Sequence, residues 1–381
     1  MPATAARRTP GARPAMAAIP FTAAAHQHIE PCFLDNAGVI GAAQNQRQPI
    51  EVPAYGFLRH ILLEVTLSGG ALGAGVLSPD FPWNVLQNVQ LLDTNGAPIF
   101  GPLDGYALLQ ANIYGGYGYR QDPRLDPGYD GTINAKFFLR IPVEITRHNA
   151  YGAIANQNAA NSYKLQYTIN NTAVFSTQPT TAPSVQVRSH LEAWSQPAPT
   201  DLAGRPQMRE PVGHGTTQFW SAFTKQTGAG QNNVLFTRVG NLIRNWIIIA
   251  RTAAGVRSDT VFPDPFLLQW DARNLTNETQ AARVKLAQEG IQAPSTRDAG
   301  VFVFPFNTLF IGHGGDEEPN FWLPTVQSSR LELSGVAAAA GSLQIVTNDI
   351  APVEVDPTER YVETSATGFH PALGQPVPQG G

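Results

Sequence analysis

The sequence has little of several things, and each shortage excludes a class of protein. One cysteine, Cys32, among 381 residues excludes an internal disulfide framework and any metal site built from cysteines. The longest apolar runs, such as "WIIIA" (246–250), are far shorter than the ~18 residues that a membrane helix needs. A formal net charge of −4 leaves no broad basic surface for nucleic acid.

Charged residues are scarce as well, at 14% of the chain against roughly 25% in soluble proteins. Such a composition favours a surface that faces other protein rather than water, although a large core with uncharged loops would explain it equally well. The length of 381 residues is too great for one ordinary domain and suits two, each with a full core.

Two similar strand-like segments lie half a chain apart. In "GFLRHILLEV" (56–65) and "NLIRNWIIIA" (241–250), an arginine follows a bulky apolar pair and precedes, by two residues, an apolar run. Arg59 and Arg244 are 185 residues apart (244 − 59). Further similar pairs follow in the same order, such as "SPDFPW" with "FPDPFL" and "SYKLQYTI" with "SSRLELSG". The repeated order predicts an internal duplication.

Extended segments with turn residues between them dominate both halves. We expect strands at 48–52, 57–67, 84–93, 136–145, 162–169 and 185–194, then two within 233–250 and one each at 265–271, 300–310, 328–335 and 341–353. Each half also predicts one short helix. Asp104 is a candidate N-cap for the first, which Gly115 would end, while Asn277 and Gln280 would form a capping box for the second, which Gly290 would end.

This inventory predicts an all-β chain with two tandem eight-stranded jelly-roll sandwiches and one short helix in each. "PCFLD" and "TQFWSAF" supply further strand candidates upstream of each half, and a parallel α/β fold would need a helix after every strand. We expect an N-terminal basic arm and lead-in at 1–47 and a first jelly roll at 48–200. A second jelly roll would follow at 201–355, with a linker at 201–215, and then a Pro/Gly-rich tail at 356–381.

Three segments carry a resemblance to a known family: "PIEVPAYGFLRHILLEVTL", "NVLQNVQLLDTNGAPI" and "LLQWDARNLTNETQAARVKLAQEG". They resemble the double jelly-roll major capsid proteins of tailless, internal-membrane double-stranded DNA phages, of the tectivirus type. The similarity covers most of 48–353 as a pattern of strand, helix and length rather than as a signature motif.

The resemblance implies a major capsid protein and no enzyme. Such a protein self-assembles as a pseudo-hexagonal homotrimer that tiles an icosahedral virion shell, because three two-domain chains present six similar sandwiches. The implied partners are neighbouring trimers, vertex and minor capsid proteins and the viral inner membrane, with no cofactor and no direct sequence-specific nucleic acid. The implied location is the virion, after synthesis in the host cytoplasm, with loops 115–131 and 313–322 on the outer surface of the shell.

The first 29 residues carry Arg7, Arg8 and Arg13 and no acidic residue before Glu30. A weak apolar segment interrupted by Pro20 makes a signal peptide the less favoured interpretation. We predict a flexible basic arm whose arginines contact the membrane or a neighbouring capsomer.

The main alternative is an enzyme with two sandwiches, of the double-cupin type. "AHQHIEP" offers His26, His28 and Glu30, whose imidazole and carboxylate groups suit divalent first-row metals. Glu30 follows His28 too closely for the usual cupin spacing, and the second half has no matching cluster. The sequence therefore favours a polar patch over a metal site, and "IGHGGDEEP" (311–319) is interpreted as a solvated loop because no G-x-S-x-G motif accompanies it.

A second alternative is a tandem carbohydrate-binding module, with tryptophan rings as sugar platforms. The candidates are Trp83, Trp194, Trp220, Trp246, Trp270 and Trp322. Most stand inside predicted strands beside apolar neighbours, which favours core packing.

Overall fold

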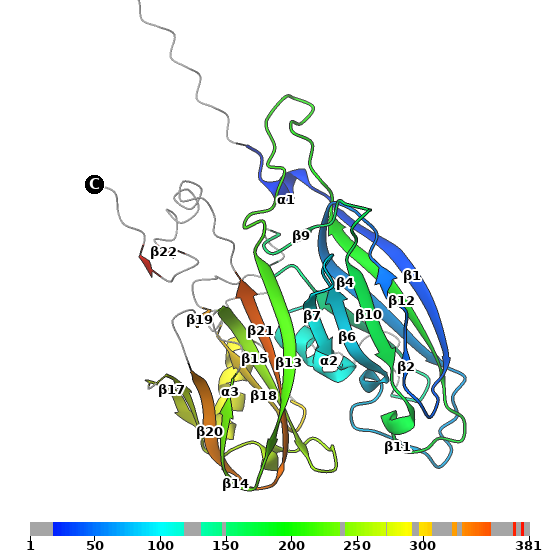
Figure 1. Cartoon of the computed structure of the whole chain (residues 1–381), viewed down its shortest axis with the longest axis vertical. Helices are drawn as coiled ribbons and strands as arrows, with labels where there is room; N and C mark the ends of the chain where they lie inside the picture. Colours follow the sequence, from blue (N-terminus) through cyan, green and yellow to red (C-terminus); the bar gives the residue numbers. More distant parts are fainter. Residues whose placement is uncertain are drawn as a thin grey trace, which may run out of the picture.

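A computed structural model describes residues 18–117, 131–146, 150–236, 241–271, 273–291, 297–306, 322–325 and 330–351, with the short pairs 369–370 and 375–376. Strands dominate this part of the chain and form two sandwiches that lie beside one another (Figure 1). Its α-helices are α1 (Phe21–Ala24), α2 (Gly105–Tyr114) and α3 (Gln280–Ile291). Among these described helices, none is long and apolar enough to cross a membrane.

The first sandwich has eight principal strands in two antiparallel sheets. One sheet has the order β1 (Gln27–Val39), β12 (Ser184–Trp194), β4 (Phe57–Ser68) and β8 (Lys136–Pro142), with β9 (Ile154–Ala155) on the end of β4. The other has the order β2 (Asn45–Gln46), β10 (Lys164–Ile169), β6 (Leu86–Leu92) and β7 (Pro98–Leu103), with β3 (Ile50–Glu51) also paired to β10. In chain order these are the first, eighth, third and sixth strands, and the second, seventh, fourth and fifth, which is a jelly roll.

The second sandwich repeats this arrangement strand for strand. One sheet has the order β13 (Thr217–Thr227), β21 (Gly341–Ala351), β15 (Leu242–Thr252) and β18 (Val301–Pro305), with β19 (Leu323–Pro324) on the end of β15. The other has the order β14 (Gly230–Leu235), β20 (Leu331–Ala337), β16 (Phe266–Trp270) and β17 (Arg273–Glu278). The prediction of two tandem jelly rolls with a short helix in each is confirmed.

Short elements complete the described chain. They are η1 (Trp83–Val85), η3 (Thr172–Val174), η4 (Asp259–Val261), the pair β5 (Val76–Leu77) and β11 (Phe175–Thr177), and the pair β22 (Phe369–His370) and β23 (Gln375–Pro376).

The two similar central strands, β4 and β15, differ in the contacts of their outer faces. In β15, Ile248 belongs to the core of its own sandwich, whereas Ile247 and Ile249 belong to a core cluster with residues of the first sandwich. This strand is therefore buried on both faces, which accounts for its continuous apolar run. In β4 the alternation is clearer, because Leu63 is fully buried and Glu64 is partly exposed.

The two helices test the predicted caps. Asp104 caps α2, because its side chain accepts a hydrogen bond from the Ala107 N–H at 2.7 Å. The predicted capping box of α3 is wrong. Asn277 lies in β17, which the sequence did not reveal, and Thr279 Oγ1 accepts from the Ala282 N–H at 3.3 Å instead. Pairing of Asn277 opposite Leu267 in β16 holds it in an extended conformation that a strand requires.

The first jelly roll begins well before the expected residue 48. β1 pairs with β12 along its whole length, from Gln27 opposite Trp194 to Val39 opposite Ser184. Its pattern is weak in the sequence because an edge strand exposes side chains on both faces. Residues 27–46 therefore lie within the sandwich and not in an arm, whereas the other expected boundaries remain predictions.

Candidate assembly interface

The two jelly rolls meet through the outer face of the sheet β13–β21–β15–β18. Trp220 of β13 is 1% exposed and pairs with Phe100 of β7 in a parallel bridge that joins the sheets of the two jelly rolls. Ile247 and Val346 on the same face pack into the core of the first jelly roll. Helix α2 belongs to this contact, and nine of its ten residues are buried. The chain thus contains one complete sandwich-to-sandwich interface, the internal junction.

Buried hydrogen bonds fix the orientation of the internal junction. Arg244 of β15 is fully buried and donates to the Gly115 carbonyl at 2.8 Å and to the Tyr117 hydroxyl at 3.3 Å. Gln218 of β13 donates to the Val143 carbonyl at 3.0 Å. These side chains of the second jelly roll supply partners for backbone carbonyls of the first, which would otherwise be unpaired away from water.

Charged groups reinforce the internal junction near its rim. The Asp80 carboxylate accepts from Arg257 Nε at 2.7 Å and from Arg251. The Tyr106 hydroxyl of α2 donates to Asp298 at 2.7 Å, and the Arg257 guanidinium lies 4.6 Å from the centre of the Tyr106 ring. Burial raises the pKa of Tyr106 far above its usual range, so the hydroxyl stays protonated and remains a donor.

A second buried arginine, Arg59, contacts side chains of the first jelly roll. Arg59 Nε lies 2.5 Å from Glu144 Oε2, and its guanidinium lies 4.4 Å from the centre of the Trp194 ring. The Trp194 indole N–H also donates to Glu144 at 3.2 Å. These side-chain contacts stabilise the end of β4, and the backbone carbonyl of Glu144 accepts from Gln218 of the second jelly roll at 3.0 Å.

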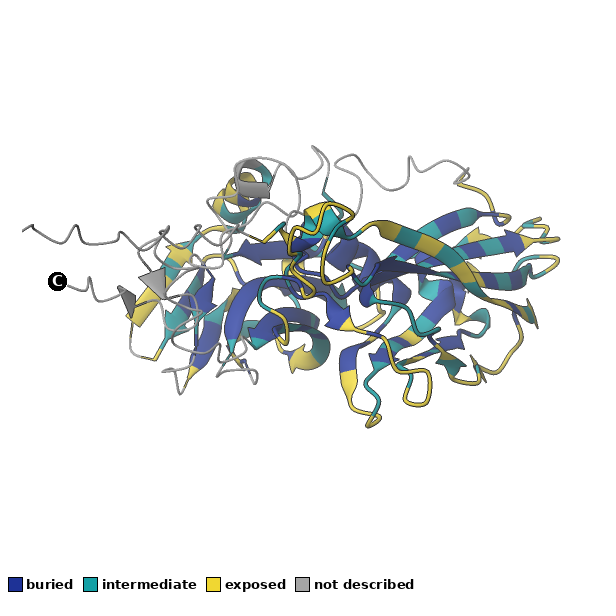
Figure 2. Ribbon diagram, turned by 90° about the horizontal axis from the view of Figure 1, so that it is seen from above, coloured by how far each residue is buried: buried dark blue, intermediate teal, exposed yellow. Residues whose placement is uncertain are grey.

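The outer surface offers one long open edge. Among the strands that the structure describes, β1 has a partner on one side only, and Ile29, Phe33 and Leu34 on it are 63%, 48% and 41% exposed. Figure 2 shows buried residues along the strands in the middle of the molecule and exposed ones toward the ends and in the loops. An open strand edge with apolar side chains is suited to contact with another protein.

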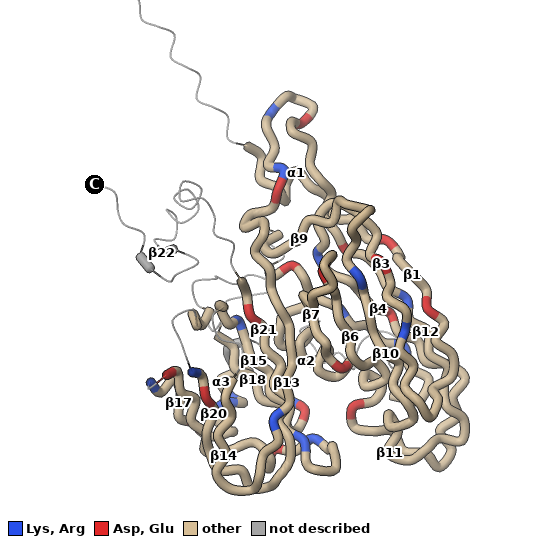
Figure 3. Tube along the Cα trace, viewed as in Figure 1, with Lys and Arg blue, Asp and Glu red and all other residues tan. Residues whose placement is uncertain are grey.

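Charge is thinly spread over this surface. Figure 3 shows lysines, arginines, aspartates and glutamates as single positions along a mostly uncharged trace. Several of them are paired with one another, such as Arg140 with Glu192 at 2.9 Å and Lys136 with Glu64 at 2.6 Å. Charged residues are therefore sparse along the described chain, and such a composition suits contact with other protein.

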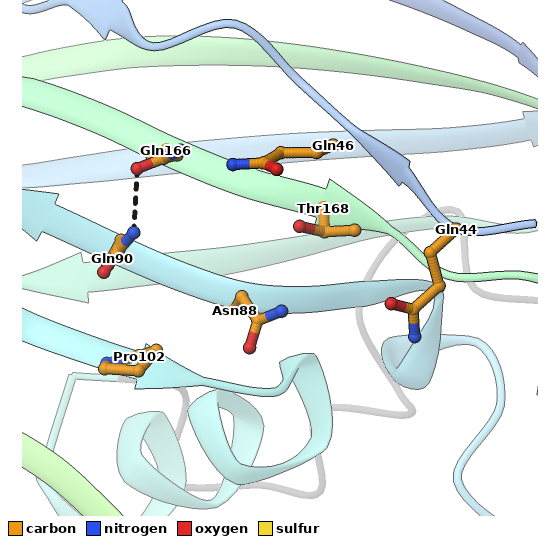
Figure 4. A pocket seen from close by; sticks show the side chains of 7 residues that line it. All are labelled: Gln44, Gln46, Asn88, Gln90, Pro102, Gln166 and Thr168. Carbon is orange, nitrogen blue, oxygen red and sulfur yellow. Dashed lines mark hydrogen bonds between the residues drawn. The ribbon is translucent and has the colours of Figure 1, made fainter.

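One hollow of about 420 Å³ lies on the sheet β2–β10–β6–β7 and is lined by amide side chains (Figure 4). The Gln90 side chain donates a hydrogen bond to the Gln166 side chain at 2.8 Å across this hollow. Gln46, Asn88 and Thr168 are among the other residues that line it. None of its lining residues is acidic or basic, so the hollow can form hydrogen bonds but offers no group for acid–base chemistry.

A second hollow of about 570 Å³ opens between the edges of β1 and of β2 and β3. Asp35 in it accepts from Arg47 Nε at 2.7 Å and from the Tyr167 hydroxyl at 2.9 Å. Burial raises the pKa of the Cys32 thiol to about 11, so it is protonated at neutral pH and a poor nucleophile.

The cupin alternative receives no support from the residues that the structure describes. His28 Nε2 lies 3.2 Å from Glu30 Oε2. The His26 side chain instead contacts Ser195, whose hydroxyl lies 2.8 Å from His26 Nδ1. Within the described ranges there is no group of three or more His, Cys, Asp or Glu side chains that could hold a metal ion.

The carbohydrate alternative also lacks support, because the tryptophans are in the core. Five of the six are at most 5% exposed and therefore cannot stack on a sugar: Trp83, Trp194, Trp220, Trp246 and Trp322. Trp270 is partly buried and packs against the second core. The predicted core packing of these residues is confirmed for the five.

Several predictions lie outside the described residues. They include Arg7, Arg8 and Arg13, most of the tail 356–381, and most of the expected surface loops 115–131 and 313–322. Conversely, the sequence did not single out Gln218, Tyr117 or Ile29, because burial between two sandwiches and exposure on an edge leave no local pattern.

Comparison with known proteins finds similar structures but no similar sequences. No protein-family model matches the sequence, and no curated protein matches it. The major capsid protein of STIV has a similar structure, with a TM-score of 0.60 at 13% identity over 86% of this chain and 97% of that chain. The major capsid protein P2 of bacteriophage PM2 gives 0.54 at 10% identity over 87% and 99%.

A third similar structure is the Faustovirus major capsid protein, with a TM-score of 0.50 at 9% identity over 87% of this chain and 91% of that chain. All three likenesses span both sandwiches, since each covers more than four fifths of this chain. The chain therefore has the double jelly-roll fold of these viral major capsid proteins.

Proposed function

We propose that this protein is the major capsid protein of an icosahedral virion of the tectivirus-like type. The observation that carries the proposal is the exact repetition of one strand order in two jelly rolls joined by a buried junction, in a fold that matches major capsid proteins over nearly their whole length. The role is mechanical rather than catalytic, and it needs surfaces that bury well against copies of the same chain.

The assembling unit in this proposal is a homotrimer. Three chains with two similar sandwiches each would give a ring of six, and a cyclic arrangement closes such a ring. The thin surface charge and the exposed apolar residues of β1 support extensive contact between copies. Permanent interfaces of this kind commonly bury more than about 2,000 Å².

Further partners belong to the same proposal. Neighbouring trimers, vertex and minor capsid proteins would complete the shell, and the arginines at positions 7, 8 and 13 would contact the inner membrane or a neighbouring capsomer. The mature protein would be located in the virion.

Native mass spectrometry at micromolar concentration tests the assembling unit. We expect a trimer of the 41.0 kDa chain that persists on dilution. A monomer or dimer that does not associate further would contradict the proposal. Electron microscopy of the associated material should then show a three-fold particle with a hexagonal outline.

A further inference from the structure

We propose that α3 of one copy packs on the outer face of the sheet β1–β12–β4–β8 of the next copy, while β17 lies beside the edge strand β1 of that sheet. In this contact Leu275 lies against Ile29 of the neighbour, as Phe100 lies beside Trp220 within the chain. The inference rests on the proposed function, because it names the surfaces through which copies assemble.

The internal junction supplies the template. There, α2 of the first jelly roll packs over the outer face of the sheet β13–β21–β15–β18, and β7 lies beside the edge strand β13, with Phe100 and Trp220 as the bridging pair. Because the two jelly rolls have the same strand order, the first jelly roll has a sheet face of the same kind, and the second has its own equivalents of β7 and α2. Within one chain these two surfaces do not meet each other.

The receiving faces can be matched residue by residue from the strand pairing. In both halves a β-bulge interrupts the central strand, at Arg59 and at Arg244. The strand beside it contributes Glu192 next to the first bulge and Asn348 next to the second.

Ile29 of β1 is paired with Glu192, and Trp220 of β13 is paired with Asn348, so these two residues occupy equivalent positions. Ile29 is 63% exposed, whereas Trp220 is 1% exposed.

The flanking residues agree with this match. By the same pairing Gln27 is equivalent to Gln218 and Phe33 to Phe223, so "QHIEPCF" and "QFWSAF" are two forms of one strand. The bulge in β1 between Pro31 and Phe33 accounts for the extra residue. Gln218 is buried by the internal junction, while Gln27 is exposed.

β17 differs from its counterpart β7 in the same way, because its apolar residue at the equivalent position is exposed. Leu275 stands four residues before the cap residue Thr279 of α3, as Phe100 stands four residues before Asp104 of α2. Leu275 is 38% exposed and Phe100 is 1% exposed.

The helices repeat this difference. Nine of the ten α2 residues are buried, whereas Leu286 of α3 is 50% exposed. Three positions that are buried at the internal junction thus have exposed counterparts in the other half: Trp220 in Ile29, Gln218 in Gln27 and Phe100 in Leu275.

The location and the chemistry of the two surfaces suit contact between copies. β1 and β17 lie on opposite sides of the molecule (Figure 1), as a head-to-tail contact requires. The receiving face keeps charged pairs, such as Arg140 with Glu192 at 2.9 Å and Lys136 with Glu64 at 2.6 Å. A more polar character than that of the internal junction is expected for a face that is wet until copies meet.

Disulfide trapping tests the contact in the full-length chain. Cys32→Ala removes the native thiol, and Ile29→Cys is then combined with Leu275→Cys, or with Arg273→Cys or Asn277→Cys two residues to either side. Bridged partners on adjacent strands are close enough for a disulfide. We expect oxidation of the assembled protein to convert most chains into a covalent closed trimer on a denaturing gel, with the highest yield for the Leu275 pair.

The controls separate this contact from others. Each single-cysteine variant should remain monomeric on the denaturing gel, and a dimer of Ile29→Cys alone would instead indicate a two-fold contact between β1 edges and overturn the inference. Leu235→Cys, on β14 at the far edge of the same sheet as β17, is the matched control with Ile29→Cys and should give no covalent trimer. If native trimers form but no β17 pair is trapped, the inference fails while the proposed function stands. If no trimer forms at all, both fail.

Discussion

Arg59 and Arg244 occupy the same place in the two jelly rolls and have different partners. Each is the extra residue of a β-bulge between the central strand and its long neighbour. Arg59 pairs with Glu144 inside the first jelly roll, whereas Arg244 crosses to the Gly115 carbonyl of the first from the second. One duplicated residue therefore stabilises a single domain in one half and the junction between domains in the other.

Removal of Arg244 should loosen the internal junction. Arg244→Ala leaves the buried Gly115 carbonyl and Asn348 side chain with fewer partners, and a buried polar group that loses its partner costs about 1–3 kcal/mol. We expect a loss of at least that size in the free energy of unfolding, measured by urea titration. Arg205→Ala, which breaks an exposed ion pair with Asp201, is the matched control and should leave the midpoint unchanged.

The Arg59–Glu144 pair should respond unequally to single and double substitution. Glu144→Ala leaves a buried guanidinium uncompensated, a change that costs about 3–5 kcal/mol in comparable sites. The double variant Arg59→Met with Glu144→Leu removes both charges and should be clearly more stable than Glu144→Ala. Thermal unfolding of the parent and the two variants checks this order, and an equal loss of melting temperature in both variants would show that packing rather than charge dominates.

Asp259 should contribute to stability above its ordinary pKa. Burial alone would raise the pKa of Asp259, but hydrogen bonds from Arg297 and the Gly300 N–H outweigh it and hold the pKa below 3.8. Because the folded-state pKa is the lower one, this stabilisation is present at neutral pH and is lost as pH falls through that value.

Asp259→Asn should therefore lower the melting temperature at pH 7 and flatten its decline below about pH 4. The exposed carboxylate variant Glu51→Gln serves as the control and should reproduce the parent curve. An unchanged slope in Asp259→Asn would show that other carboxylates control acid unfolding.

The basic arm should act through charge. Substituting Gln for Arg7, Arg8 and Arg13 together should weaken binding of trimers to anionic liposomes, most clearly at low salt, since each basic residue near such a surface contributes about 1 kcal/mol. Substitution is preferable to deletion through residue 25, because Phe21 packs against Phe57 and Trp194. Neutral liposomes are the control. Equal binding of parent and variant to anionic liposomes would favour a contact with neighbouring capsomers.

The fold class and the presence of two jelly rolls could be predicted from the sequence. Strand periodicity, turn residues and the repeated position of Arg59 and Arg244 predicted two jelly rolls, and Asp104 predicted the start of α2. These features are local, because burial of alternate residues and caps of single helices leave their pattern within a few positions.

Which surfaces contact one another could not be predicted from the sequence and became clear only from the folded chain. β1 and β17 were missed or shortened because strands at sheet edges lack the alternating burial that marks a central strand, and Asn277 was misplaced because pairing with β16 outweighed its capping preference. Trp220 and Ile29 hold the same position in one duplicated strand, yet one is buried and the other exposed. Their difference depends on what packs against each sheet face, and contacts between residues far apart in the chain leave no local pattern in either strand.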